Sequence, residues 1–196
     1  MGTLKVIMVA YRRIIPLRIA IDSFLNQAEP NWELHIIHDG PAQPEIRAIV
    51  DQRPDPRIRF LQTTKVNGRW GHPNRRYMLQ RIEASPDDYI LITNDDNYYV
   101  PIFTKTIKSY MKHKPGIIYY NTLHNYFGYT VHHSKLKVGS IDMGAFVVRA
   151  DVAKAVGFKH DREVADGYYA EECATYCRER GLQMIYIPNM VPFIHN

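Results

Sequence analysis

The feature of the sequence that most constrains its fold is an apolar run close to the N-terminus. Residues 4–10, with the sequence LKVIMVA, are mostly apolar and show no alternation of polar and apolar positions. Such a run is typical of a strand that is buried on both faces of a sheet. Strands of this kind belong to parallel sheets that helices cover on both sides. The sequence therefore predicts a central parallel strand at 4–10.

Strand and helix patterns alternate along the first half of the chain. Apolar residues recur at helical spacing after Pro16, a residue that suits the first turn of a helix. The alternation predicts an α/β fold with a mostly parallel central sheet. The expected strands are 4–10, 33–38, 58–62 and 89–93, and the expected helices are 16–25, 45–51, 73–84 and 102–113.

The second half of the chain departs from this regularity. Short strand patterns lie close together there, so we expect a smaller, partly antiparallel part beside the main sheet. The length of 196 residues suits one domain with a continuous core. The expected strands of this half are 117–123, 126–133, 144–149 and 184–187, and its expected helices are 151–156 and 170–180.

Positive charge is concentrated in two stretches. The formal net charge is +5, yet residues 45–81 carry nine Lys or Arg against three acids, and residues 104–137 carry six Lys and no acid. Such stretches suit nucleic acid, an anionic membrane surface or phosphorylated small molecules. A solvated basic face is the alternative, and charge alone does not choose among them.

The cysteines and the hydropathy pattern bear on the compartment. Cys173 and Cys177 lie four residues apart in one expected helix and lack the partners of a zinc site. No apolar run approaches the roughly 20 residues that span a bilayer, so we expect neither a signal peptide nor a transmembrane helix. A reducing cytoplasm is the expected location.

Polar or aromatic residues directly follow three of the expected strands. Ligands of open α/β sheets bind at the carboxyl ends of the strands, so these residues are candidates for a site. They are 10–13 (AYRR), 38–41 (HDGP) and 94–97 (NDDN). No strand is followed by GxGxxG or by GxxxxGKS/T, so neither a dinucleotide fold with its glycine fingerprint nor a P-loop NTPase is supported.

Two adjacent carboxylates, Asp95 and Asp96, lie in the middle of the third of these segments. Their repulsion is on the order of 1 kcal/mol or more unless water or a cation screens it. A divalent cation resolves the conflict, and carboxylates are suitable ligands for Mg²⁺ or Mn²⁺ that also bridges a diphosphate. An acidic turn in solvent is the alternative.

Three segments, 6–13, 32–40 and 89–97, resemble in order and spacing the inverting nucleotide-sugar glycosyltransferases of family 2. The resemblance covers nearly the whole chain. It implies the GT-A fold, a Rossmann-like arrangement with a mostly parallel central sheet and a small, partly antiparallel acceptor-side part. It also implies a single GT-A domain over 1–196, with a nucleotide-binding half at 1–100 and an acceptor-side half at 101–196.

The resemblance implies roles at the donor end of the site. Tyr11 would border the base, and Asp39 would accept a hydrogen bond from the imide N–H of uracil, which favours a uridine donor. Asp95 would contact the ribose and Asp96 would hold Mn²⁺ or Mg²⁺. The other residues that the resemblance places at the donor site are Ala10, Arg13, Arg69 and Arg75, of which Arg69 or Arg75 would meet the diphosphate unless it is a surface charge.

The resemblance also implies residues at the acceptor end. The general base would sit at the start of a late helix, where Glu172 matches best, with Glu171 and then Asp166 behind it. A carboxylate that only complements the helix dipole is the alternative. Asp142 would contact donor sugar or acceptor, and His195 would reach the metal or diphosphate unless the terminus frays.

The resulting hypothesis is metal-assisted transfer of a sugar, with inversion, from a UDP-sugar to a hydroxyl acceptor. The acceptor would be a saccharide or a lipid-linked saccharide. We expect no nucleic-acid partner, and the basic stretches leave open a peripheral contact with the inner face of a membrane. The alternatives are a nucleotidyltransferase and a non-catalytic basic module that binds RNA or anionic lipid.

Overall fold

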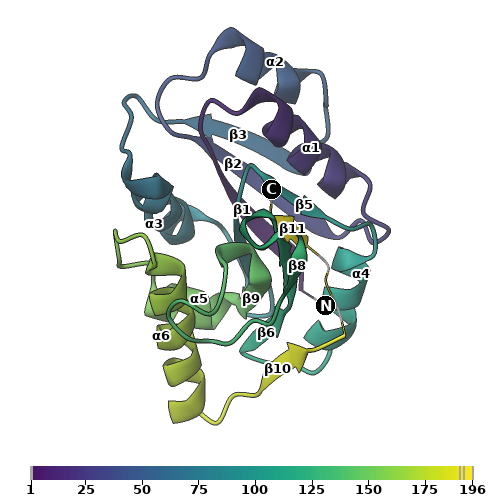
Figure 1. Cartoon of the computed structure of the whole chain (residues 1–196), viewed down its shortest axis with the longest axis vertical. Helices are drawn as coiled ribbons and strands as arrows, with labels where there is room; N and C mark the ends of the chain where they lie inside the picture. Colours follow the sequence, from purple (N-terminus) through teal and green to yellow (C-terminus); the bar gives the residue numbers. More distant parts are fainter. Residues whose placement is uncertain (1, 190, 192, 196) are drawn as a thin grey trace.

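A seven-stranded sheet forms the centre of the molecule (Figure 1). The structure, a computed structural model, describes residues 2–189, 191 and 193–195, without the side chains of residues 127, 193 and 195. The order of the strands differs from their order along the chain, as crossover connections require. In sheet order they are β10 (Met184–Ile187), β6 (Ile117–Tyr120), β9 (Phe146–Arg149), β4 (Tyr89–Asn94), β1 (Leu4–Ala10), β2 (Trp32–His38) and β3 (Ile58–Gln62).

Strand β1 lies between β2 and β4 and is parallel to both. All seven of its residues are buried, and Leu4 pairs with Trp32 on one side and with Tyr89 on the other. Strands β2 and β3 are also parallel, whereas β9 runs antiparallel to β4 and β6. The prediction of a central parallel strand at the N-terminus and of a mostly parallel sheet is confirmed.

Helices cover both faces of the sheet (Figure 1). Three of them, α3, α5 and α6, pack together on one side, and α1 packs against α2 on the other. Helix α4 lies beside the end of α1. The Thr104 N–H of α4 donates a hydrogen bond to the side chain of Gln27, two residues after α1 ends. The helices are α1 (Ile14–Leu25), α2 (Pro44–Asp51), α3 (His72–Arg81), α4 (Phe103–Met111), α5 (Ala150–Val156) and α6 (Ala165–Glu179).

A small second sheet, which lies beside the main one, is partly antiparallel, as expected. In sheet order it contains β5 (Asn97–Tyr99), β11 (Phe193–His195), β7 (Thr122–His124) and β8 (Thr130–His132). Strand β11 is antiparallel to β5 and parallel to β7, and β7 and β8 form a hairpin. Short 3₁₀ turns are η1 (Arg69–Gly71), η2 (Asn125–Phe127) and η3 (Met143–Ala145).

The second half of the chain differs in detail from the prediction. The strand expected at 117–123 is broken at Asn121, whose side-chain amide donates to the Pro188 carbonyl, so that β6 and β7 enter different sheets. The strand expected at 126–133 is reduced to β8, because η2 occupies 125–127. The helix expected at 170–180 begins at Ala165, a difference that matters for the site.

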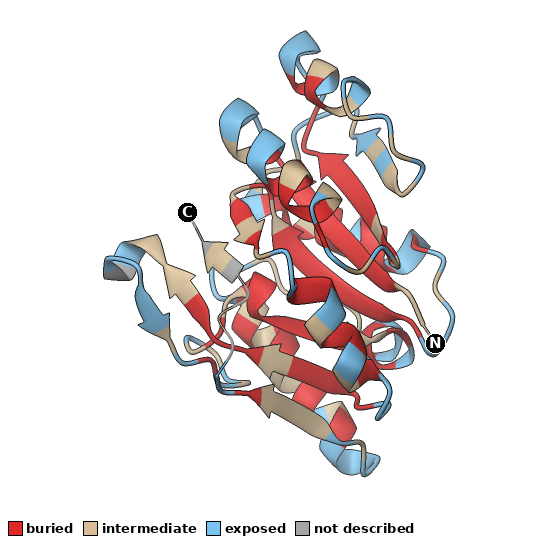
Figure 2. Cartoon of the chain, turned by 90° about the vertical axis from the view of Figure 1, so that its right-hand side faces the viewer, coloured by how far each residue is buried: buried red, intermediate tan, exposed pale blue. Residues whose placement is uncertain are grey.

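Buried residues are concentrated in the central strands, and the outward faces of the helices are exposed (Figure 2). Burial of this kind is the main stabilising contribution of a parallel sheet. Within the described part of the chain, no helix combines the length and apolar character that crossing a bilayer demands.

Candidate functional site

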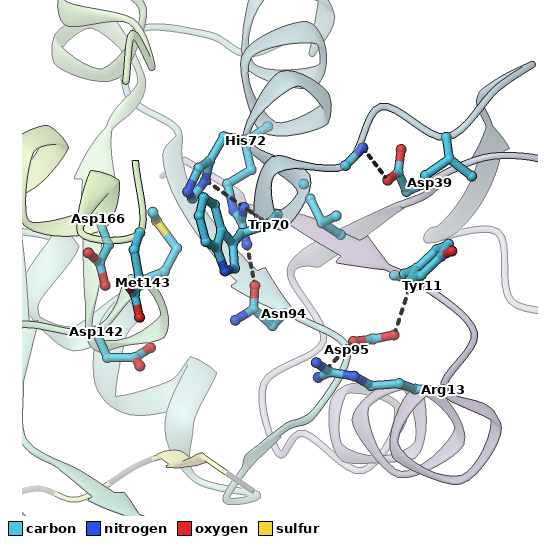
Figure 3. Close-up of a pocket in the computed structure, with 17 residues that line it drawn as sticks. Tyr11, Arg13, Asp39, Trp70, His72, Asn94, Asp95, Asp142, Met143 and Asp166 are labelled. Atoms are coloured by element: carbon cyan, nitrogen blue, oxygen red, sulfur yellow. Dashed lines mark hydrogen bonds and ion pairs between the residues drawn. The ribbon is translucent and has the colours of Figure 1, made fainter. Parts of the chain in front are cut away.

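A cleft of about 500 Å³ opens where the carboxyl ends of β1, β2 and β4 meet the first turn of α6 (Figure 3). We call it the main cleft. It brings together most of the residues expected at the donor site with one of the candidate bases. Its lining residues are Val9, Ala10, Tyr11, Arg13, Asp39, Val66, Gly68, Trp70, Gly71, His72, Arg75, Asn94, Asp95, Asp142, Met143, Glu163 and Asp166.

Asp95 links the ends of β4 and β1. Its carboxylate accepts a hydrogen bond of 3.0 Å from the Tyr11 N–H, and the Arg13 guanidinium lies 3.5 Å from its other oxygen. Burial raises the pKa of Asp95 to about 7, although the Tyr11 N–H and Arg13 oppose the shift, and the charge of Asp96 adds to it. Burial and the neighbouring Asp96 thus disfavour the ionised form of Asp95, and a bound cation would stabilise that form.

Asp96 lies next to the main cleft rather than in its lining. One carboxylate oxygen forms an ion pair with Arg13, and the other, Oδ1, is buried and finds no hydrogen-bond partner within the described residues. An orphaned carboxylate oxygen next to a second carboxylate suits a divalent cation. The part of the chain that the structure describes contains no group of three or more His, Cys, Asp or Glu arranged around a metal.

Asp39, at the end of β2, organises the loop that precedes α3. Its two oxygens accept hydrogen bonds of 2.9 Å from the N–H groups of Asn67 and Gly68 and from the side-chain amide of Asn74. A carboxylate has about four acceptor positions, so room for one more donor remains. The expected contact with a uracil imide is compatible with this geometry and is a proposal below. Asn67 and Asn74 were not among the predicted site residues.

Arg75 is a buried cation at the base of the main cleft. It donates to the Trp70 carbonyl, to His72 Nδ1 and to Asn94 Oδ1, while its Nε has no partner among the described residues. Burial lowers the pKa of Arg75 to about 10, so the side chain stays charged at neutral pH. The carboxylates that oppose this shift are Asp166, Asp142, Asp96 and Asp95.

His72 is neutral because of its partners. Its Nδ1 accepts from Arg75 at 2.9 Å, which leaves Nε2 to donate to the Arg162 carbonyl at 2.9 Å. Burial lowers the pKa of His72 to about 4, and the charge of Arg75 adds to the shift. This histidine was not predicted, since a single His in a loop has no distinctive pattern.

Asp166 lies in the first turn of α6 and faces the main cleft (Figure 3). Gly167 allows this, because a Cβ on that residue would lie 2.5 Å from Val138 Cα. Burial raises the pKa of Asp166 to about 6, and the charge of Asp142 adds to the shift, while the Gly167 N–H and Arg75 oppose it. A half-buried carboxylate with a pKa near the working pH is suited to accept a proton.

Glu171 and Glu172 are not at the start of α6, so that expectation is wrong. The helix begins at Ala165, which places both residues beyond its first turn, in a separate pocket against α5. Glu171 accepts a hydrogen bond of 2.9 Å from the Val138 N–H, and Glu172 contacts His160 Nε2 at 2.8 Å. Both carboxylates hold loops that border the main cleft.

Three other predicted residues have different placements. Arg69 points to Asp161, 3.1 Å away, and does not line the main cleft. Asp142 lines it and accepts a hydrogen bond of 3.0 Å from the Gly144 N–H. The backbone of His195 pairs with Asn97 in the small sheet, and its side chain lies outside the described part of the structure.

The chain has the same fold as several solved structures. One is S. aureus TarS 1-349, with a TM-score of 0.78, 12% identity, and coverage of 99% of this chain and 60% of that one. For the same protein in complex with UDP-GlcNAc the TM-score is 0.77 and the identity 13%, with coverage of 98% of this chain and 58% of that one. For the mannosyltransferase PcManGT from Pyrobaculum calidifontis, in complex with GDP-Man and Mn²⁺, the TM-score is 0.72 and the identity 14%, with coverage of 97% of this chain and 56% of that one. The chain thus spans about three fifths of these chains and has the GT-A fold.

The sequence matches the family described as glycosyl transferase family 2 over residues 5–146. This match includes β1 to β4 and the loops that build most of the main cleft. It favours glycosyl transfer over nucleotidyl transfer and over a non-catalytic basic module. The chain belongs to glycosyl transferase family 2.

Proposed function

We propose that this chain transfers a sugar from a UDP-sugar to a hydroxyl acceptor, with inversion at the anomeric carbon. One observation carries the proposal: the main cleft holds the Asp95 carboxylate at the strand ends and the half-buried carboxylate of Asp166 on α6. The diphosphate of a donor needs positive charge beside it, which Arg75 and a cation bound at Asp95 would supply, and an acceptor hydroxyl needs a base, for which Asp166 is the candidate. All three residues line the same cleft of about 500 Å³.

The nucleotide end of the proposed site is formed by Ala10, Tyr11 and Asp39. Tyr11 is 40% exposed, which leaves its ring accessible to a base. The remaining acceptor position of Asp39 suits the imide N–H of uracil. The similarity to TarS in complex with UDP-GlcNAc supports a UDP-sugar, while the GDP-Man complex of PcManGT makes a guanosine donor the comparison to exclude.

Asp96 and Asp95 are the residues that would hold Mn²⁺ or Mg²⁺. The support is the orphaned Oδ1 of Asp96 and the pKa of Asp95, which burial raises to about 7. When bound, the cation would offset negative charge on the departing diphosphate. Arg75 would contribute a second, fixed positive charge at the base of the main cleft.

Asp166 is the residue we propose as the general base. It would accept the proton of the acceptor hydroxyl while that oxygen attacks the anomeric carbon and the bond from this carbon to the diphosphate breaks. Attack opposite the leaving group in a single displacement inverts the configuration. Glu172 and Glu171 contact neighbouring loops, so they have structural roles in this proposal.

The acceptor would enter beside Asp166 and Asp142, which come from the 101–196 half. We propose that this half receives a saccharide or a lipid-linked saccharide, and that 1–100 binds the nucleotide, within one domain. A cytoplasmic location with a peripheral contact at the inner face of a membrane is consistent with such an acceptor.

The test is turnover of UDP-sugars, measured as release of UDP, in the wild type and two carboxylate variants. We expect Asp166→Asn to lower turnover by about 10²-fold or more while UDP binding is retained, since loss of a general base removes an effect of that size. Glu172→Gln is the matched control and should keep most of the activity. Full activity of Asp166→Asn, or retention of configuration in the product by NMR, would refute the assignment.

A further inference from the structure

Trp70, the more exposed of the two tryptophans, lies in the lining of the main cleft. Its side chain is 63% exposed, whereas Trp32, the other tryptophan, is 1% exposed. A large aromatic side chain gains much from burial, so an exposed indole beside a cleft indicates a surface that a ligand covers. None of the roles assigned above uses this ring.

The backbone around Trp70 adopts a conformation that holds the ring outside the core. Arg69 and Trp70 have φ angles of 49° and 53°, in the left-handed region that only glycine adopts readily. Gly68 and Gly71 flank them with φ angles of 64° and 76°. Strained residues of this kind persist where the surrounding structure enforces them, and they are common at ligand sites.

Two contacts enforce this conformation. The buried Arg75 guanidinium donates to the Trp70 carbonyl, and the Gly71 N–H donates to the Gly68 carbonyl at 2.9 Å. A Cβ on Gly71 would lie 2.5 Å from Val9 Cγ1, so the turn is also pressed against β1. The backbone that carries the indole at the edge of the main cleft is therefore held in place before any ligand arrives.

The place of the ring in the main cleft indicates which part of a donor it meets. Figure 3 shows Trp70 near Asn94 and His72, on the side toward Met143, Asp142 and Asp166, whereas Tyr11 and Asp39 lie at the other end. The base would occupy the Tyr11 end. The indole lies between that end and the proposed base Asp166, where the transferred sugar must be held.

We propose that Trp70 is the platform on which the sugar ring of the donor stacks, and that it selects pyranoses with an apolar face. The inference rests on the proposed function. The flat face of an indole complements the C–H groups on one side of a pyranose, and the polar hydroxyls then point away toward Asp142, Asn94 and solvent. Trp70 is thus a specificity-determining residue, and the nucleotide itself should bind without it.

Fluorescence provides the first test, because the chain has only two tryptophans and Trp32 is buried. With excitation at 295 nm, acrylamide should quench Trp70 efficiently in the free protein. UDP-glucose, UDP-galactose or UDP-GlcNAc with Mn²⁺ should reduce this quenching at least about twofold, and UDP with Mn²⁺ should leave it unchanged. Trp70→Phe leaves only the Trp32 signal and is the reference.

Binding measured by calorimetry provides the second test. Trp70→Ala should weaken binding of the preferred UDP-sugar about tenfold and leave binding of UDP unchanged, while Trp70→Phe should restore most of the affinity. Tyr77→Ala, another exposed aromatic, on α3, is the control and should change neither affinity. Thermal melting of each variant checks its folding.

The outcomes separate this inference from the proposed function. If the wild type binds UDP and UDP-sugar but the sugar does not protect Trp70, the platform is refuted and the proposed function stands. Equal protection by UDP alone, or equal loss of both affinities in Trp70→Ala, assigns the ring to the nucleotide and also refutes it. If no nucleotide binds, both proposals fail.

Discussion

At the scale of single residues, the main cleft is defined by carboxylates whose surroundings differ. Burial raises the pKa of both Asp95 and Asp166, but Asp95 lies beside Arg13 and Asp96, whereas Asp166 is influenced by Asp142 and Arg75. Asp39 accepts three hydrogen bonds and has a structural task already. A division of this kind is expected where one carboxylate accepts a proton and others bind charge.

The raised pKa of Asp166 predicts an acid limb in the pH profile. A general base works only when deprotonated, so with saturating Mn²⁺, which keeps Asp95 ionised, Asp166 should make kcat/KM fall about tenfold per unit below about pH 6. Asp142 raises the pKa of Asp166 and Arg75 lowers it. The other titratable residues that line the main cleft are Tyr11, Arg13, Asp39, His72, Asp95 and Glu163. Asp142→Asn should therefore move the limb to lower pH. A limb that stays in place in Asp166→Asn would contradict the assignment.

His72 predicts a pH dependence of stability. Its pKa is about 4 in the folded state against about 6.5 unfolded, so the unfolded state binds the proton first as pH falls. The contribution of His72 to the free energy of unfolding is therefore at its full value above pH 6.5 and decreases as the pH falls toward 4, by up to about 3 kcal/mol. Urea unfolding at pH 7, 5 and 4 should show a smaller loss in His72→Gln. Equal losses in the two proteins would show that His72 is not held neutral.

At the scale of elements, the sequence predicts the strands better than the site. Strand β1 has one apolar run and no polar alternation, and the prediction matches the structure at 4–10. The start of helix α6 was predicted five residues too late, because Gly167 and the two tyrosines after it are weak helix formers and the start of the helix depends on packing against Val138. Because the start was placed too late, the sequence ranked Glu172 ahead of Asp166 as the general base.

The loop between β3 and α3 shows why part of the site was not predictable. Asn67, Trp70 and His72 have no periodic pattern. Asn67 donates to Asp39, which is 28 residues away along the chain, and Trp70 and His72 contact the buried Arg75 of the following helix. The left-handed turn at Arg69 and Trp70, flanked by Gly68 and Gly71, places the Trp70 carbonyl within reach of Arg75. The residues after β1, β2 and β4 were predictable, since strand ends of a parallel sheet meet at one edge.

Gly167 predicts a coupled effect on α6 and on Asp166. In Gly167→Ala the new Cβ would lie 2.5 Å from Val138 Cα and 3.2 Å from Gly139 N, so the first turn of the helix must shift. We expect a lower melting temperature and a clear loss of turnover, even though alanine favours helices by about 1 kcal/mol over glycine. Thr175→Ala, on the exposed side of the same helix, is the control and should retain both. A more stable, fully active Gly167→Ala would show that the contact is not tight.

At the scale of the whole molecule, ligand binding should be visible as stability, because the main cleft joins both halves of the chain. Its lining comes from β1, the loop before α3, the end of β4, η3 and the start of α6. A ligand at 100 times its Kd adds about 2.7 kcal/mol to the folded state. In a chain of 196 residues this corresponds to a rise of about 5–10 °C in melting temperature.

Thermal melting with nucleotides therefore tests the donor and the metal together. We expect UDP with Mn²⁺ to raise the melting temperature more than GDP, dTDP or ADP, and more than UDP alone. Asp96→Ala should keep the fold, since Arg13 can still pair with Asp95, and should abolish the part of the shift that depends on Mn²⁺. Asp87→Ala, at an exposed ion pair with Lys114, is the matched control and should keep it. An Mn²⁺-dependent shift that persists in Asp96→Ala would place the cation elsewhere, and a larger shift with GDP would transfer the donor assignment from uridine to guanosine.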